Sequence, residues 1–288
     1  MSLAGRARRI ALAAAYGSGG IGLLGAGTAA LLVTEARLAR RWIGPITEVP
    51  PRADGLYGAS YPGAPLELMM LGDSSAAGLG VHDPTQTPGA LLAAGLASAA
   101  RRPVRLRCVA RTGAQSVHLG PQVDQALLAR PDVAVLMIGG NDVTHRVRPS
   151  ASVRLLDEAV RRLRGAAIEV VVGTCPDLGT IEPVAQPLRY IAQQWSRQLA
   201  AAQTIVVVEA GGRTVSLGDL LGPEFAARPR ELFGPDRFHP SAAGYAAAAT
   251  AMLPSVSAAL GFALEPDEQA PADTAAPAAV ARGVRDVA

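Results

Sequence analysis

The chain has 288 residues with 27 basic and 24 acidic side chains, and 49% of it is hydrophobic. Every basic residue is an arginine, so no lysine is present to form a Schiff base or to bind phosphate in a P-loop. The basic excess lies in residues 1–52, where seven arginines face two acidic residues, whereas residues 53–264 hold 18 arginines against 17 acidic residues. Because this nearly neutral body carries no nucleic-acid-binding motif, we expect no nucleic-acid partner.

A long apolar stretch lies near the N-terminus. Residues 10–33 carry no charge over 24 positions and follow three arginines within residues 6–9. A membrane-spanning helix needs about 20 apolar residues, whereas the apolar core of a signal peptide has about 7–15. We therefore expect residues 1–43 to form a signal or anchor segment, and the protein to be exported and held at the membrane or cell envelope. A buried helix of the soluble domain is the alternative, and cleavage of the segment stays open.

The rest of the chain divides into three parts. Residues 44–65 are rich in proline and glycine and favour a linker, residues 66–263 carry regular patterns typical of a folded domain, and residues 264–288 favour a disordered tail. Short β-branched runs predict buried parallel strands; these runs are 66–71, 104–109, 133–138, 168–172 and 205–208. Helical stretches near 88–101, 120–130, 150–164, 187–202 and 241–262 separate or follow them. The alternation predicts a three-layer α/β/α sandwich around a five-stranded parallel sheet.

Polar and glycine-rich segments follow the expected strands. Ligands of open α/β sheets bind beyond the carboxyl ends of the strands, so these segments are the candidate site. The segments are G-D-S-S at 72–75, R-T-G-A at 111–114, G-G-N-D at 139–142 and D-R-F-H at 236–239.

Together the four segments resemble the signature blocks of the SGNH hydrolases, also called the GDSL esterase/lipase family, in the family's order and across residues 66–262. The stretch G-L-G-V at 78–81 is similar to an actinobacterial branch of that family, and Ser75 stands where the G-D-S-L motif has leucine. The resemblance implies a flavodoxin-like sheet with strand order 2-1-3-4-5. That order separates Cys108 from Cys175 by about three strand spacings, roughly 14 Å, so we expect two free thiols.

The resemblance also implies a catalytic site. Ser74 is the expected nucleophile, activated by His239, while Asp236 accepts the other ring N–H and stabilises the imidazolium. The oxyanion hole is expected from the backbone N–H groups of Ser74 and Gly113 and from the side-chain amide of Asn141, the only asparagine of the chain. Each residue taken alone is equally typical of a turn or a helix cap, and the prediction depends on finding all of them together.

This site favours a serine esterase that acts on a small-molecule ester or on an acylated lipid or glycan. An acyltransferase with a glycan or lipid acceptor is the alternative, and a non-catalytic binding module is a third reading. An α/β-hydrolase is excluded because its G-x-S-x-G motif would end at Ala76. The remaining histidines, His82, His118 and His145, lack metal-ligand spacing, so we expect neither a metal nor another cofactor. His145 and Arg146 are either pocket residues or surface residues.

Overall fold

The computed structural model describes residues 31–35, 37–38, 41 and 48–262, which form an α/β structure around one mostly parallel sheet. The sheet has the order β1-β3-β2-β4-β5-β6, and every pair is parallel except β1 with β3. The strands are β1 (Gly55–Tyr57), β2 (Leu66–Gly72), β3 (Val104–Cys108), β4 (Val133–Met137), β5 (Glu169–Gly173) and β6 (Arg213–Val215). With β1 set aside, this is the expected order 2-1-3-4-5.

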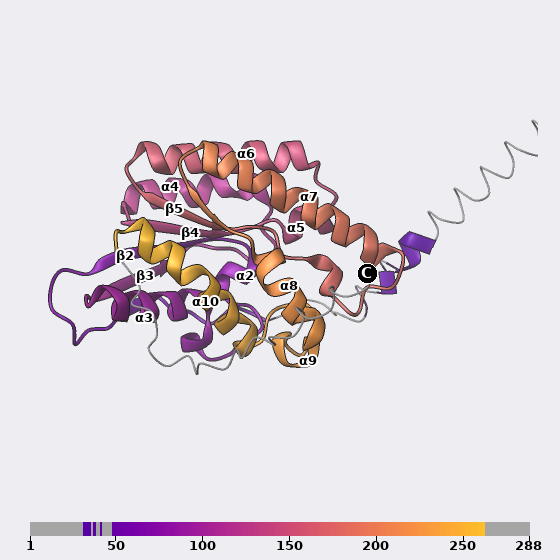
Figure 1. Ribbon diagram of the computed structural model, residues 1–288, viewed down its shortest axis with the longest axis horizontal. Helices are drawn as coiled ribbons and strands as arrows, with labels where there is room; N and C mark the ends of the chain where they lie inside the picture. Colours follow the sequence, from indigo (N-terminus) through magenta and orange to yellow (C-terminus); the bar gives the residue numbers. More distant parts are fainter. Residues whose placement is uncertain (1–30, 36, 39–40, 42–47, 263–288) are drawn as a thin grey trace, which may run out of the picture.

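Helices cover both faces of the sheet, as Figure 1 shows, with α4, α6 and α7 on one face and α3 and α10 on the other. Their bounds are α3 (Pro88–Ala100), α4 (Leu119–Ala129), α6 (Pro149–Gly165), α7 (Leu188–Glu209) and α10 (Ala242–Ala259). Because side chains alternate along a strand, Leu68 and Met70 of β2 pack in the core under α3 and α10, whereas Met69 and Leu71 pack in the core under α4 and α6. The three-layer prediction is therefore confirmed.

The sheet has one strand more than predicted. β1 lies inside the segment that we expected to be a linker, and it pairs antiparallel with β3 at the edge of the sheet. The Asp54 carboxylate accepts a hydrogen bond from the Cys108 N–H at 2.7 Å, and the Tyr57 hydroxyl donates to the Ala53 carbonyl at 2.7 Å. Three residues on an edge produce no readable alternation, which is why the pattern missed them.

The expected strand at 205–208 is wrong. These residues form the last turns of α7, and the final strand is β6, several residues later. Val207 is fully buried against the sheet, while Ile205 and Val208 are more than half exposed, which is the spacing of a helix and not of a buried strand. Tertiary packing has here overridden the β propensity of an Ile-Val-Val-Val run.

Two short helices between β6 and α10 were not predicted. They are α8 (Leu217–Ala227) and α9 (Pro229–Leu232), and Figure 1 shows them beyond the ends of the strands, beside α10. Pro223 and Pro229 interrupt the sequence pattern of this region. Pro229 occupies the first turn of α9, where a proline is tolerated, whereas Pro223 lies inside α8. Of the two, α8 forms one side of the pocket described below.

Most of the expected N-terminal signal or anchor segment lies outside the described residues. Residues 31–35 are helical and lie beside the first turn of α7 (Figure 1). There the buried Glu35 carboxylate accepts a hydrogen bond at 3.0 Å from the N–H of Leu188, which is one of the free amides of the α7 N-terminus. No helix within the described ranges is long and apolar enough to cross a membrane.

Candidate active site

Ser74 is the first residue of the short helix α2 (Ser74–Ala77), directly after β2. The preceding Gly72 has φ +128°, and a Cβ there would lie 1.9 Å from the Met137 carbonyl oxygen, so only glycine fits this crossing. Asp73 then caps α2, because its Oδ1 accepts a hydrogen bond from the Ser75 N–H at 2.9 Å. The sharp turn leaves the Ser74 side chain at the carboxyl edge of the sheet.

His239 links Ser74 to Asp236. Its Nε2 lies 3.0 Å from the Ser74 Oγ, and its Nδ1 lies 2.6 Å from the Asp236 Oδ2. The other oxygen of Asp236 accepts from the backbone N–H groups of Phe238 and His239 at 2.9 and 3.0 Å. The structure thus brings the three predicted residues into one hydrogen-bonded row, with His239 and Ser74 both buried.

The two aspartates of the site have opposite pKa shifts. Burial alone would raise the pKa of Asp236, but hydrogen bonds from the His239 ring and from the Phe238 and His239 amides outweigh it, and the net pKa lies below the ordinary value. Burial raises the pKa of Asp73 to about 6, against a smaller lowering by the Ser75 amide and by His239, and with a further raising by Asp142. Asp236 therefore stays ionised to lower pH than Asp73 does.

The expected oxyanion donors lie on segments that follow three neighbouring strands, β2, β3 and β4. Gly113 has φ +76°, a conformation suited to glycine, and a Cβ there would meet nothing within 4 Å. Asn141 lies in α5 (Gly140–Thr144), and its Nδ2 donates to the Ala114 carbonyl at 3.1 Å. Because an amide carries two N–H donors, this bond fixes the loop that contains Gly113 and leaves a second donor. The Ser74 N–H belongs to the first turn of α2, where no intrahelical acceptor exists.

A buried cluster ties the Gly113 loop to α5. The Asp142 carboxylate accepts from the Ser116 N–H at 3.1 Å and from its hydroxyl at 3.0 Å, and the Ser116 and Ser152 hydroxyls lie 2.8 Å apart. Burial raises the pKa of Asp142, opposed by these bonds from Ser116. Asp142 and Ser116 therefore support the site from behind, while Asn141 faces the pocket.

Two buried glutamines that the sequence analysis did not single out clamp the strand ends. Gln122 of α4 accepts from the Gly72 N–H at 2.7 Å and donates to the Gly72 carbonyl at 3.0 Å. Gln203 of α7 donates to the Ile138 carbonyl at 3.0 Å and accepts from the Cys175 N–H at 2.7 Å. Backbone groups at a strand end have no ladder partner, so each amide satisfies two of them. Their only sequence signal is a glutamine on the inner face of an amphipathic helix.

The G-L-G-V stretch supports the histidine. Gly80 has φ +106°, and a Cβ there would lie 2.7 Å from the Pro240 carbonyl oxygen and 3.1 Å from the His239 Cβ. The Leu79 carbonyl accepts a hydrogen bond from the buried Tyr245 hydroxyl at 2.6 Å. This stretch therefore packs directly against the loop that carries His239. A side chain at Gly80 would collide with that loop, which explains the glycine.

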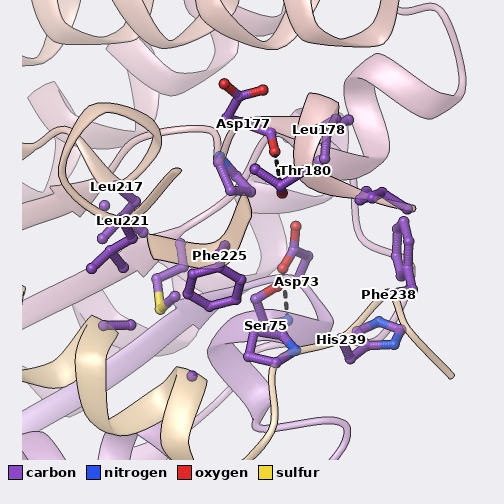
Figure 2. Close-up of a pocket in the computed structure, with 18 of the residues that line it drawn as sticks. Asp73, Ser75, Asp177, Leu178, Thr180, Leu217, Leu221, Phe225, Phe238 and His239 are labelled. Carbon is purple, nitrogen blue, oxygen red and sulfur yellow. Dashed lines mark hydrogen bonds between the residues drawn. The ribbon is translucent and has the colours of Figure 1, made fainter. Parts of the chain in front are cut away.

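A pocket opens beside Ser74 and His239 and encloses about 890 Å³ including its mouth. Figure 2 shows Leu217, Leu221 and Phe225 of α8 on one side and Phe238 with His239 on the other, while Leu178 and Thr180 form the far wall. The Asp177 carboxylate points away from this space and binds the Arg197 guanidinium at 2.9 Å. The surface facing Ser74 is consequently mostly apolar.

Other expectations for the pocket are wrong in part. From the sequence we expect the loops 76–88, 143–150 and 174–186 to build the pocket, but of these only 174–186 lines it. His145 and Arg146 are exposed and lie outside its lining, and His145 Nδ1 lies 2.9 Å from the Asn141 carbonyl oxygen. His118 accepts from the Gln115 N–H, and His82 is exposed. No group of three or more metal-ligating side chains gathers among the residues that the structure describes.

Both cysteines are free thiols. Cys108 is half-buried at the end of β3, and burial raises the pKa of its thiol to about 11. Cys175 is fully buried after β5, where burial and the charges of Asp73, Asp142 and Asp177 raise its thiol pKa well above the ordinary value. Neither thiol is activated as a nucleophile.

Comparison with known proteins points to the family that the four sequence segments resemble. Residues 70–247 match the GDSL-like lipase/acylhydrolase family. The chain is 44% identical over 253 residues to the GDSL-like esterase Rv1075c of Mycobacterium tuberculosis, covering 83% of this chain and 79% of that protein.

Solved structures with the same fold are more distant in sequence. The lipase/acylhydrolase from Enterococcus faecalis superposes with a TM-score of 0.56 at 16% identity, covering 67% of this chain and 96% of that one. A catalytic mutant of the acetylxylan esterase Axe2 from Geobacillus stearothermophilus superposes with a TM-score of 0.54 at 19% identity, covering 70% and 97%. With the family match over most of the folded part, the chain belongs to the GDSL-like lipase/acylhydrolase family, the SGNH hydrolases, and is a serine hydrolase of ester bonds.

Proposed function

We propose that the protein hydrolyses carboxylic esters through an acyl-enzyme on Ser74. The observation that carries the proposal is the row of two hydrogen bonds from the Ser74 Oγ through His239 to Asp236, at 3.0 and 2.6 Å, at the edge of an apolar pocket. A serine hydroxyl is a weak nucleophile until a base removes its proton, and His239 is within reach to do so.

The first half of the reaction transfers the acyl group to the enzyme. The Ser74 Oγ attacks the ester carbonyl carbon while His239 Nε2 takes the hydroxyl proton, and Asp236 stabilises the resulting imidazolium. The carbonyl oxygen becomes an oxyanion that accepts hydrogen bonds from the Ser74 and Gly113 amides and from the second N–H of Asn141. When the intermediate collapses, the ester C–O bond breaks and His239 returns the proton to the leaving alcohol.

The second half repeats these steps with water. His239 deprotonates a water molecule, the water attacks the acyl carbon, and the carboxylic acid leaves as Ser74 recovers its proton. An alcohol that enters in place of water would receive the acyl group, which is the acyltransferase reaction. Measuring the free acid and the transfer ester formed as a glycerol or sugar acceptor is titrated distinguishes these outcomes, and acid as the main product supports hydrolysis.

The test of the nucleophile is Ser74→Ala, assayed on p-nitrophenyl acetate and butyrate. We expect turnover to fall by about 10⁴–10⁶-fold, and a fluorophosphonate to add covalently to the wild type but not to the variant in an intact-mass measurement. Ser75→Ala, one residue along the same turn, is the matched control and should keep both properties. Equal turnover by wild type and Ser74→Ala would reject the proposal.

We also propose that the N-terminal segment anchors the protein at the cell envelope. The support is the uncharged run at 10–33, long enough to span a bilayer, and the Glu35 carboxylate bound to the α7 N-terminus, which ties this segment to the domain. The intact chain should pellet with membranes and be released by detergent and not by carbonate. Full-length protein in the soluble fraction would reject the anchor, and a shortened chain would indicate a cleaved signal.

A further inference from the structure

A second hollow lies next to the pocket that contains Ser74. It encloses about 470 Å³ with its open mouth, and it shares Phe233 with the first pocket. Its other lining residues are Glu182, Pro229, Arg230, Gly234, Pro235 and Arg237. Ile181, the neighbour of Glu182, lines the first pocket, so the two hollows adjoin along the 181–182 backbone and the Phe233 ring.

Two of the residues that line the second hollow are arginines outside any ion pair of the described residues. Arg230 and Arg237 are exposed and have no ion pair within the described part of the chain, whereas the nearby Arg228 binds Glu224 and Glu231. Glu182 is the one acidic residue of the lining and is likewise outside every ion pair found there. Two guanidinium groups against one carboxylate leave a formal surplus of one positive charge, and guanidinium groups bind carboxylate and phosphate oxygens well.

Arg237 is held by the turn that holds His239. It has φ +55°, its N–H donates to the Gly234 carbonyl at 2.9 Å, and the Gly234 N–H donates to the His239 carbonyl at 2.8 Å. A glycine or asparagine adopts this backbone conformation at lower cost than an arginine. The turn therefore does not explain the arginine, although it fixes the start of its side chain beside the catalytic loop.

The chemistry of the proposed function places the alcohol part of the substrate on this side. His239 must give its proton to the leaving oxygen, so the alcohol leaves next to the 234–239 loop. Gly234, Pro235 and Arg237 of this loop line the second hollow. The acyl chain has the apolar wall of α8 available on the opposite side of the first pocket. An ester that lies across Ser74 thus extends its alcohol end toward Arg230 and Arg237.

We infer that the second hollow binds an acidic group, a carboxylate or a phosphate, carried by the alcohol part of the ester substrate. The inference rests on the proposed function. Arg230 and Arg237 attract this acidic group and so determine substrate specificity. Glu182 weakens the attraction, because its carboxylate repels the same group.

The test compares two esters that differ by one charge, 4-butyryloxybenzoate and its methyl ester, with 4-butyryloxyphenyl phosphate as the phosphate probe. The measured quantity is the ratio of kcat/KM for the anionic ester to kcat/KM for the neutral ester. In the double variant Arg230→Gln/Arg237→Gln this ratio should fall about tenfold, and the loss should shrink as salt is raised. Glu182→Gln should change the ratio in the opposite direction, upward by about threefold.

The control is Arg101→Gln/Arg130→Gln, which removes the same net charge at the opposite, amino edge of the sheet; both are likewise exposed arginines with positive φ, at +50°. This pair should leave the ratio unchanged. An unchanged ratio in the first double variant, or an equal fall in the control, overturns the inference, because the charge effect would then be absent or unspecific. Failure of the proposed function looks different: Ser74→Ala would hydrolyse both esters as fast as the wild type.

Discussion

The carboxyl edge of the sheet and the wall of the pocket are built in different ways. At the edge, polar groups are held by specific bonds: Asp236 accepts three, Gln122 fastens both backbone groups of Gly72, and Asp142 fastens Ser116. The wall consists mainly of apolar side chains from α8 and the 178–181 segment, which touch the pocket without directional bonds; Thr180, whose hydroxyl donates to the Asp177 carbonyl, is the polar exception. Reaction chemistry requires positions fixed to about 0.5 Å, whereas apolar packing tolerates exchange of similar volumes.

This difference predicts two kinds of mutant. Substitutions at the edge should lower turnover of every ester by a similar factor, because the same atoms stabilise each transition state. Substitutions in the wall should change which ester is preferred. The predictions below test this division, beginning with the largest effect.

After Ser74→Ala, the largest effect is expected from Asp236→Asn. The amide oxygen can still accept the Phe238 and His239 N–H groups, but the amide nitrogen would then face His239 Nδ1 and force the opposite ring tautomer. His239 Nε2 would carry the proton and could not accept the Ser74 hydroxyl, so kcat should fall by about 10⁴-fold. Acetate and octanoate p-nitrophenyl esters should lose activity by the same factor. Asp157→Asn, at a surface ion pair with Arg161, is the control and should keep the activity of the wild type. A loss of kcat for only one of the two esters would contradict the division between edge and wall.

Asn141→Ala should have the next largest effect. Removing one oxyanion donor costs about 10²–10³-fold in turnover, and the fall should appear in kcat more than in KM. The same side chain also holds the Ala114 carbonyl, so circular dichroism melting is measured beside the kinetics. A lowered melting temperature with less than a tenfold loss of turnover would assign Asn141 to the loop and not to the oxyanion.

The sequence was most informative at the edge. G-D-S, G-x-N-D and D-x-x-H are short and local, because each sits on a tight turn whose residues are neighbours in the chain, and Ser74, Asn141, Asp236 and His239 were accordingly predicted and found together. Gly113 was likewise predicted, and the structure adds its positive φ.

The wall could not be predicted in the same way. Leu217, Leu221 and Phe225 lie on a helix interrupted by proline, and their apolar pattern is equally typical of core packing. The 205–208 run shows the same limit, since local β propensity could not reveal that α7 continues across the sheet. The glutamine clamps need two partners distant in the chain, and no local pattern announces such a pair.

Asp73 offers a test of the edge through stability. Its pKa is about 6 in the folded protein and near 4 in an unfolded chain, so the folded state holds a proton that the unfolded state has lost between these values. Stability from this group is therefore greatest at low pH and declines as the pH rises from about 4 to above 6. Asp236 acts in the opposite sense, because its pKa is lowered and its contribution is lost only as the pH falls below the ordinary range.

Asp73→Asn keeps the cap of α2 and removes the titration. Relative to the wild type, its free energy of unfolding should rise by roughly 2–3 kcal/mol between pH 4 and pH 7.5, measured by urea denaturation. Asp83→Asn, at an exposed helix cap, is the matched control. Between pH 4 and pH 7.5 its free energy of unfolding should change with pH nearly as that of the wild type does. Parallel curves for Asp73→Asn as well would mean that the Asp73 carboxylate is not shielded from water.

The wall is tested by Leu221→Trp, for which the smallest effect is expected. Leu221 is half-buried and lines the pocket, whereas Leu220, the preceding residue of α8, is 58% exposed and does not line it. An indole at 221 would occupy the space of a long acyl chain, so the kcat/KM ratio of p-nitrophenyl octanoate to acetate should fall about tenfold. Leu220→Trp adds the same group to the same helix and should not change the ratio. If Leu221→Trp instead lowered kcat/KM for both esters by the same factor, the division between wall and edge would be wrong. A change in apolar packing would then have displaced the hydrogen-bonded row at Ser74.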